Sequence, residues 1–245
     1  MLAGTSKSTP KFRLIIQGGI MKTVLITAFL ITLTLKAHAL NFDSDVPKTI
    51  QDQMVQDLTF MNELTGTGQT PFHKEIYGEV SGANYKKFFE SHIFSVGVDD
   101  CGGGAAVACV QPFFDPNKMW LTDNFIKFNH PQVARMMVVY HEARHSETNH
   151  GSWGHDSCPR PFRDSEGKDM VSIWTGAKLE GQPACDSTYL GSYGSSTVML
   201  KNISKFCTNC SDKVKMDANI YATDQLGRID RPDVKKAMLA DFENN

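Results

Sequence analysis

The sequence has no long hydrophobic run, no internal repeat and no large excess of one charge. Its longest apolar run spans residues 23–35, whereas a membrane-spanning helix needs about 20 apolar residues. The 245 residues carry a formal net charge of -2, with 41% hydrophobic residues and ten prolines. These figures exclude collagen-like, low-complexity and multi-span membrane proteins, and they leave the class of soluble globular proteins.

Acidic residues are absent from the first 39 residues, which hold five Lys and Arg. The rest of the chain has 20 Lys and Arg against 27 Asp and Glu, a net charge of -7. A protein that neutralises nucleic-acid phosphates needs a basic face. We therefore expect no nucleic-acid partner.

The segment from Met21 to Ala39 has the form of a secretory signal peptide. One Lys precedes the apolar run, and Ala37 and Ala39 supply a small-x-small cleavage pattern. We therefore predict an exported protein, periplasmic or extracellular, with no stable membrane insertion after cleavage. Because Leu40 rather than Cys follows the predicted cleavage site, no lipid attachment is expected.

The domain organisation predicted from this leader is simple. Residues 1–20 are interpreted as an upstream extension or a mis-assigned start, and residues 21–39 as the signal peptide. Residues 40–245 are long enough to form one domain with its own core. The sequence leaves the oligomeric state open.

All six cysteines lie in residues 40–245, and an even number in an oxidising compartment favours disulfides over free thiols. Closeness in sequence predicts three pairs: Cys101 with Cys109, Cys158 with Cys185, and Cys207 with Cys210.

Periodicity and turn residues predict an α+β fold, in which a small mixed sheet packs on a buried helix, with C-terminal helices and disulfide-stapled loops. Residues 65–84 are expected to form a loop with one short strand at 75–77, and residues 149–191 a long irregular segment. The expected helices are 46–64, 84–94, 132–147, 195–206, 211–226 and 232–242, and the expected strands are 93–98, 108–114 and 118–125.

The helix predicted at 132–147 carries the strongest chemical motif, His141-Glu142-Ala143-Arg144-His145. Two His residues at i and i+4 project from one helix face, so both imidazoles can bind one metal ion. Glu142 lies about 100° further round the helix. From there its carboxylate can reach a water in an open coordination position and act as general base.

Residues 129–155, with the apolar helix that leads into this motif, resemble the active-site helix of zincin metallopeptidases. The chain is also similar to uncharacterised exported bacterial proteins in which an H-E-A-R-H helix is followed by His-x-x-Cys-Pro. The zincin resemblance implies a zinc ion, Glu142 as base, and an upstream edge strand that aligns the substrate. Residues 120–122 are the candidate for that strand.

The third metal ligand has several candidates. The metzincin pattern requires Gly at position 148 and His at position 151, but this chain has Thr148 and Gly151. His155, at the end of a Gly-rich turn, is the preferred ligand. Asp186 is the alternative, because Asp186 to Tyr189 is similar to the Asp-x-x-Tyr portion of aspzincins. Further candidates are His150 and Glu180.

Two more side chains are assigned roles from the sequence. Tyr193 is a candidate hydrogen-bond donor to a tetrahedral oxyanion. Arg144 and Glu147 stand at i and i+3, so we expect an ion pair on the helix surface.

The sequence therefore predicts an exported zinc metallopeptidase that hydrolyses peptide bonds of a peptide or protein substrate through a zinc-activated water. Its predicted site comprises Glu142 and Tyr193 as catalytic residues, with His141, His145, His155 and Asp186 as metal ligands. One alternative is a secreted, non-catalytic metal-binding or structural protein, whose zinc site is closed because all four ligands bind at once. Another is a zinc amidase that acts on cell-wall peptides.

Overall fold

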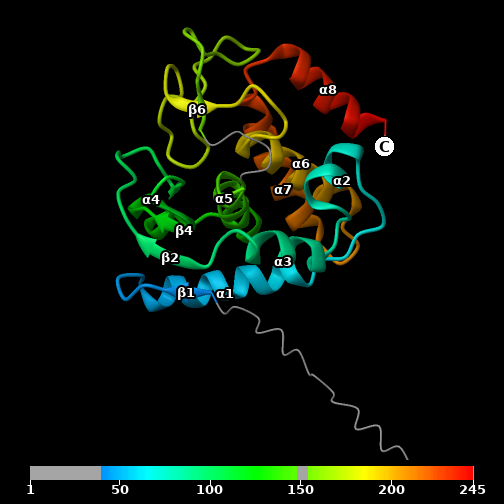
Figure 1. Cartoon of the computed structure of the whole chain (residues 1–245). Coiled ribbons are helices and arrows are strands. Elements are labelled where there is room, and N and C mark those ends of the chain that lie inside the picture. The colour runs from blue at the N-terminus through cyan, green and yellow to red at the C-terminus, as the bar shows by residue number, and fades with distance from the viewer. Residues whose placement is uncertain (1–39, 148–153, 245) are drawn as a thin grey trace, which may run out of the picture. The chain divides into compact units, whose positions relative to one another are not determined.

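Helix α5 (Gln132–His145) lies at the centre of the computed structural model, which describes residues 40–147 and 154–244 (Figure 1). From Val133 to His145 all but Arg135 of its residues are buried, because its apolar residues occur on every side of the helix. The helix contacts the sheet through β3 and β4, and it also contacts α1, α3, α6 and α7. This burial places the predicted metal-binding motif inside the protein.

The main sheet has four strands in the order β1-β2-β4-β3. The first three run parallel, and β3 pairs antiparallel with β4 and forms one edge. The strands are β1 (Asn41–Phe42), β2 (Ser95–Val98), β3 (Ala108–Gln111) and β4 (Asp115–Leu121), and a second sheet pairs β5 (Asp156–Ser157) with β6 (Pro183–Cys185).

The prediction of an edge strand at residues 120–122 is wrong. Trp120 and Leu121 belong to β4, which is paired on both sides, and Thr122 caps the helix that follows. The loop closed by the disulfide between Cys101 and Cys109 connects β2 to β3. Strand β3 then pairs with the side of β4 that faces away from β2. The edge strand next to α5 is therefore β3.

The remaining helices agree with the α+β class expected from the sequence. They are α1 (Lys48–Asn62), α2 (Pro71–Tyr77), α3 (Gly82–Glu90), α4 (Asp123–Lys127), α6 (Ser192–Phe206), α7 (Asp212–Gly227) and α8 (Pro232–Glu243). For five of these helices the predicted boundaries differ by a few residues at most, whereas α4 was not predicted, because the strand expected at 118–125 ends at Leu121.

Helix α2 replaces the loop and short strand expected between residues 65 and 84. Thr70 caps the helix by accepting a hydrogen bond from the backbone N–H of His73, and Pro71 occupies the first helical turn. Both residues favour a helix start. The β-strand expected at 75–77 is therefore wrong, because the N-terminal helix signal outweighs the short apolar run.

The three predicted disulfides are confirmed, and they join Cys101 to Cys109, Cys158 to Cys185, and Cys207 to Cys210. Such bonds fit a protein that is exported to an oxidising compartment. No helix within the described ranges is long and apolar enough to cross a membrane. The predicted extension and signal peptide lie outside the described residues.

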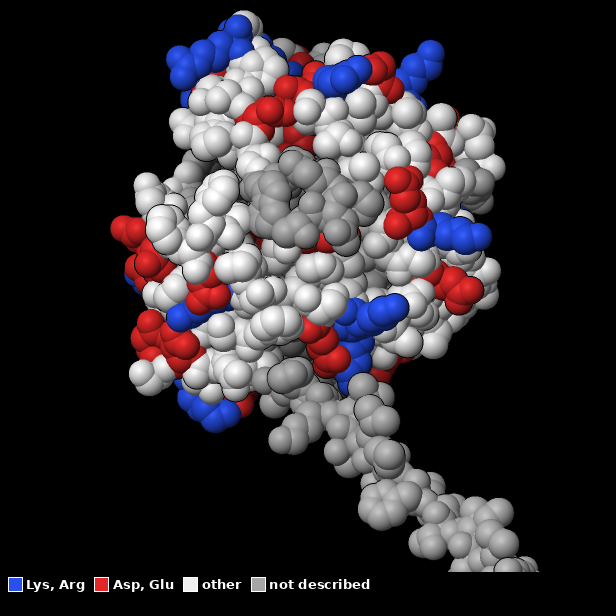
Figure 2. All heavy atoms as spheres, in the orientation of Figure 1, with Lys and Arg blue, Asp and Glu red and all other residues white. Residues whose placement is uncertain are grey.

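The described face in Figure 2 carries charges of both signs between uncharged residues. Several charged side chains of the described residues, on whichever face they lie, form exposed ion pairs, such as Lys168 with Glu166 and Arg231 with Asp233. Exposed pairs of this kind contribute little to stability.

A buried ion pair joins α1 to the central helix. Arg135 donates from Nε and Nη2 to the two carboxylate oxygens of Asp57, at 2.6 and 2.7 Å. The side chains are only 11% and 2% exposed. Because the charges are shielded from water, removing one partner leaves the other buried without compensation.

We expect Asp57→Asn to lower the free energy of unfolding by about 3 kcal/mol, because Arg135 keeps a buried charge. Asp52→Asn is the matched control, since Asp52 pairs with Lys48 on the same helix in an exposed position. Its cost should stay below about 0.5 kcal/mol. Urea unfolding measures both, and equal costs would contradict the importance assigned to burial.

His73 on α2 is a second buried polar residue whose side chain is hydrogen-bonded. Its Nδ1 lies 2.9 Å from the carbonyl oxygen of Gly78, and its Nε2 lies 2.8 Å from the Tyr85 hydroxyl. Burial lowers the pKa of His73 from 6.5 to about 4, an effect that the contact with Gly78 partly opposes. The folded protein therefore keeps this ring neutral under mildly acidic conditions.

This pKa shift predicts a loss of stability as the pH falls from 6.5 to about 4, because the unfolded chain takes up a proton that the folded protein does not bind. By pH 5 the loss at this residue should be about 2 kcal/mol. Urea unfolding with EDTA at several pH values should show a smaller loss for His73→Gln than for the natural chain. Parallel pH profiles of the two proteins would refute the assignment.

Candidate metal centre

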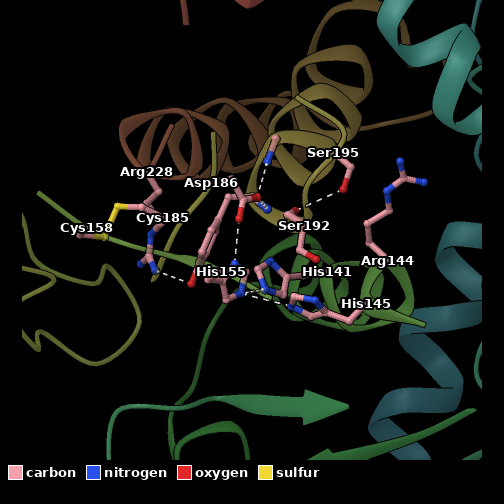
Figure 3. A network of polar contacts seen from close by, with 12 residues as sticks. His141, Arg144, His145, His155, Cys158, Cys185, Asp186, Ser192, Ser195 and Arg228 are labelled. Carbon is pink, nitrogen blue, oxygen red and sulfur yellow. Dashed lines mark hydrogen bonds and ion pairs between the residues drawn. A yellow bond between two sulfur atoms is a disulfide. The ribbon is translucent and has the colours of Figure 1, made fainter. Parts of the chain in front are cut away.

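Three imidazoles converge where α5 ends. His141 and His145 occupy its last turns, and His155 comes from the segment just before β5 (Figure 3). The Nε2 atom of His155 lies 3.1 Å from the Nε2 atoms of both His141 and His145. Among the described residues, these three form a group whose ligand atoms all lie within 4.8 Å of one another.

The separation of these nitrogens fits a shared cation. Ligand atoms at the usual Zn–N distance of 2.0 to 2.1 Å in a tetrahedral site lie about 3.3 Å from one another, and the observed separation is 3.1 Å. The neutral imidazole of His155 must carry its hydrogen on Nδ1, because Nδ1 faces a carboxylate that can only accept. Its Nε2 lone pair therefore faces the other two rings, and a metal ion held there would stabilise the arrangement.

Asp186 orients His155 and is itself fixed by the N-terminus of α6. Its Oδ1 lies 2.8 Å from Nδ1 of His155, and its Oδ2 accepts a hydrogen bond from the backbone N–H of Tyr193 at 2.7 Å. A Cβ at Gly191 would lie 2.4 Å from this second oxygen, so only glycine leaves room for the carboxylate. The sequence predicts Asp186 as a metal ligand, but it contacts Nδ1 of His155, whereas the other two histidines lie near Nε2 of that ring.

The disulfide between Cys158 and Cys185 brings His155 and Asp186 together. Cys158 follows His155 by three residues, and Asp186 follows Cys185 directly. The strands β5 and β6 pair between them, with Asp156 opposite Cys185. Closing this loop restricts the unfolded chain and contributes roughly 3 to 4 kcal/mol.

His141 is held in an environment that disfavours its charged form. Burial lowers its pKa well below the usual value, and the neighbouring His155 and His145 lower it further. The ring also has a hydrogen bond with the backbone of Ser192, the first residue of α6. A neutral imidazole is the form that binds a metal ion.

Glu142 lies beside the two helix histidines and lines the same cleft. It is only 5% exposed. Burial raises its pKa to about 8, although a hydrogen bond with the backbone of Val110 on β3 opposes the shift. The edge strand therefore holds the carboxylate at the cleft.

Tyr193 packs its ring against the cluster. The centroid of the ring lies 4.6 Å from that of His141 and 4.4 Å from that of His155. Its hydroxyl accepts a hydrogen bond from Nη1 of Arg228 at 3.0 Å. Burial raises the pKa of Tyr193, so the hydroxyl keeps its hydrogen at neutral pH.

A cleft with a volume of about 570 Å³ opens onto these residues. Its lining includes the loop from Cys101 to Val110, which contains most of β3, and also Trp174 and Leu179. His141, Glu142, His145 and His155 line the same cleft. A ligand in the cleft can therefore reach both the three imidazoles and the carboxylate.

The other sequence-based candidates have different positions. Glu180 is half-buried and is not part of the His cluster, and His150 lies outside the described residues. Arg144 contacts Glu147 as predicted, but the pair is not on the helix surface, because Arg144 is 2% exposed. Its Nε donates to the carbonyl oxygen of Leu190 at 2.7 Å, since the loop before α6 covers this end of α5.

Sequence reasoning missed three residues that support the site, namely Val110, Ser192 and Arg228. Val110 and Ser192 act through their backbone groups, which are the same in almost every residue type and therefore leave no signal in the sequence. Arg228 lies at the C-terminal end of α7, where the helix dipole alone favours a cation, so an arginine there does not indicate a functional site. The sequence therefore held no signal that singled them out.

Comparison of the chain with protein-family models, curated proteins and solved structures gives no match.

We expect Asp186→Asn to weaken metal binding by about 10- to 100-fold, because the carboxylate orients His155 from behind. Asp156→Asn is the control, since Asp156 is the exposed neighbour of His155. Competition with a chromophoric chelator measures both affinities for Zn²⁺. Unchanged affinity in Asp186→Asn would contradict the orienting role.

Proposed function

We propose that the chain is an exported zinc-dependent metallopeptidase with zincin-like organisation. The observation that carries the proposal is the convergence of three imidazole Nε2 atoms beside the buried carboxylate of Glu142, in one cleft. Three nitrogen ligands are a set that catalytic zinc sites use. The three disulfides support export, and the signal-peptide pattern favours a periplasmic or extracellular location.

The donor set supports zinc over the harder divalent cations. Imidazole nitrogen suits zinc, whereas magnesium and calcium prefer oxygen ligands. His141, His145 and His155 would hold the ion. When bound, zinc supplies Lewis acidity, which lowers the pKa of water to about 7 and polarises a carbonyl group.

The chain's own residues would handle the proton and the developing charge. In the proposed reaction the ionised form of Glu142 accepts a proton from the attacking water and delivers it to the leaving amine. A cation held by the three histidines would favour this ionised form, because an opposite charge nearby lowers the pKa that burial has raised. The Tyr193 hydroxyl donates a hydrogen bond to the oxygen that becomes negatively charged. The edge strand β3, which lines the cleft, would align an extended peptide by main-chain pairing.

The position of Asp186 favours an open site over a closed structural one. Both of its carboxylate oxygens already have partners, one on His155 and one on the N-terminus of α6. A fourth protein ligand from Asp186 would require breaking the contact that orients His155. Three protein ligands leave room for water, which a catalytic site needs.

We expect Glu142→Gln to retain one zinc per chain and to lose turnover by about 10²- to 10⁴-fold, because the amide cannot accept the proton. Metal analysis and activity on a mixed peptide library measure the two effects. Glu90→Gln, on the exposed side of α3, is the control and should keep both properties. Equal turnover in the natural chain and Glu142→Gln would remove the catalytic assignment.

The substrate class is tested by comparing casein with cell-wall peptides. Cleavage of casein supports a peptidase that acts on proteins. Release of cell-wall fragments without casein cleavage would replace the proposal with a zinc amidase. Zinc binding without any hydrolysis would favour the non-catalytic alternative.

A further inference from the structure

We propose that Arg228 is a positioning residue, whose guanidinium holds the Tyr193 hydroxyl so that the hydroxyl hydrogen faces the cleft. This inference rests on the proposed function, because it assigns a role to a residue in the same reaction. It extends the site to the C-terminal end of α7, which lies more than 70 residues beyond the metal-binding histidines.

The direction of one hydrogen bond carries the argument. An arginine side chain has only donors, so in the 3.0 Å contact between Nη1 of Arg228 and the Tyr193 hydroxyl, the phenolic oxygen must accept. The single hydrogen of the hydroxyl is therefore left for another acceptor. Within the described ranges, no second hydrogen bond of this hydroxyl occurs.

The surroundings restrict where this hydrogen can point. Tyr193 and Arg228 both line the cleft. The Arg228 guanidinium carbon lies 4.7 Å from the centroid of the Tyr193 ring, and the ring packs on His141 and His155. With these contacts on the ring and on the oxygen, the hydroxyl hydrogen is available to an acceptor that enters the cleft.

Arg228 is fixed to the same frame as the metal-binding residues. Its carbonyl oxygen accepts a hydrogen bond from the backbone N–H of Asp186 at 3.0 Å. Asp186 in turn contacts His155 and the backbone of Tyr193. The donor and the histidines are therefore positioned together, so the hydroxyl is arranged before a substrate arrives.

An ion pair on the far side of the guanidinium provides the matched control. Nε of Arg228 lies 3.3 Å from Oδ2 of Asp224, one turn earlier on α7. Arg228 is 6% exposed, so its charge needs a nearby partner. Asp224→Asn removes this pair but leaves the contact between Arg228 and Tyr193.

The test compares Tyr193→Phe, Arg228→Met, the double variant and Arg228→Lys, each loaded with zinc. We expect Tyr193→Phe to lower kcat by about 10²-fold with little change in KM, as for loss of one oxyanion donor. Arg228→Met should lower kcat by about 10-fold, and adding it to Tyr193→Phe should cause no further loss. Arg228→Lys should recover part of the activity, because an ammonium group also only donates.

A second readout does not depend on turnover. The affinity of the zinc-loaded protein for acetohydroxamate should fall in Tyr193→Phe and in Arg228→Met, and zinc affinity should not change in either. Losses of kcat that multiply in the double variant would overturn the proposal. A loss in Asp224→Asn as large as that in Arg228→Met would also overturn it, because the arginine would then act only through its ion pair.

The outcome separates this inference from the proposed function. If Glu142→Gln matches the natural chain in turnover, the peptidase assignment fails, and acetohydroxamate binding alone decides the role of Arg228. If Glu142→Gln is inactive and Arg228→Met equals the natural chain in kcat and in acetohydroxamate affinity, the peptidase assignment stands and the positioning role fails.

Discussion

The arrangement of the site depends on one carboxylate, that of Asp186. One of its oxygens contacts His155 and the other accepts from the backbone at the N-terminus of α6. The favourable charge of a carboxylate at a helix N-terminus contributes to this second contact. Through these two contacts a loop residue and a helix are aligned with α5. The same helix supplies Tyr193 and the backbone of Ser192, which has a hydrogen bond with His141. Asp186 therefore links the positions of His155, Tyr193 and His141.

Local patterns in the sequence were sufficient for the three disulfides and for six of the eight helices in the described residues, but not for α2 and α4. The apolar centre of α5 has no Gly or Pro, and the spacing of His141, Glu142 and His145 is determined by the helix alone. The three disulfides join cysteines that are neighbours in sequence. The start of α2 is also encoded, in Thr70 and Pro71, but the surrounding Gly and Thr residues favour a loop.

Features that depend on distant pairing could not be predicted. Whether a strand lies at the edge or inside a sheet depends on the order of pairing, and for this reason β4 was mistaken for the edge in place of β3. The sequence pattern predicts that Arg144 is exposed to solvent, because the loop around Leu190 that buries it lies 46 residues later in the chain. The choice between His155 and Asp186 required the position of a loop relative to a helix, which residue spacing does not specify.

The disulfide between Cys158 and Cys185 also makes the geometry of the site depend on the redox state of two sulfur atoms. In a reducing cytosol both thiols would stay separate, and the chain that carries His155 would not be tethered to Asp186. The bond adds a covalent link between the two segments that form the contact between His155 and Asp186, so its reduction would loosen the position of His155 relative to His141 and His145.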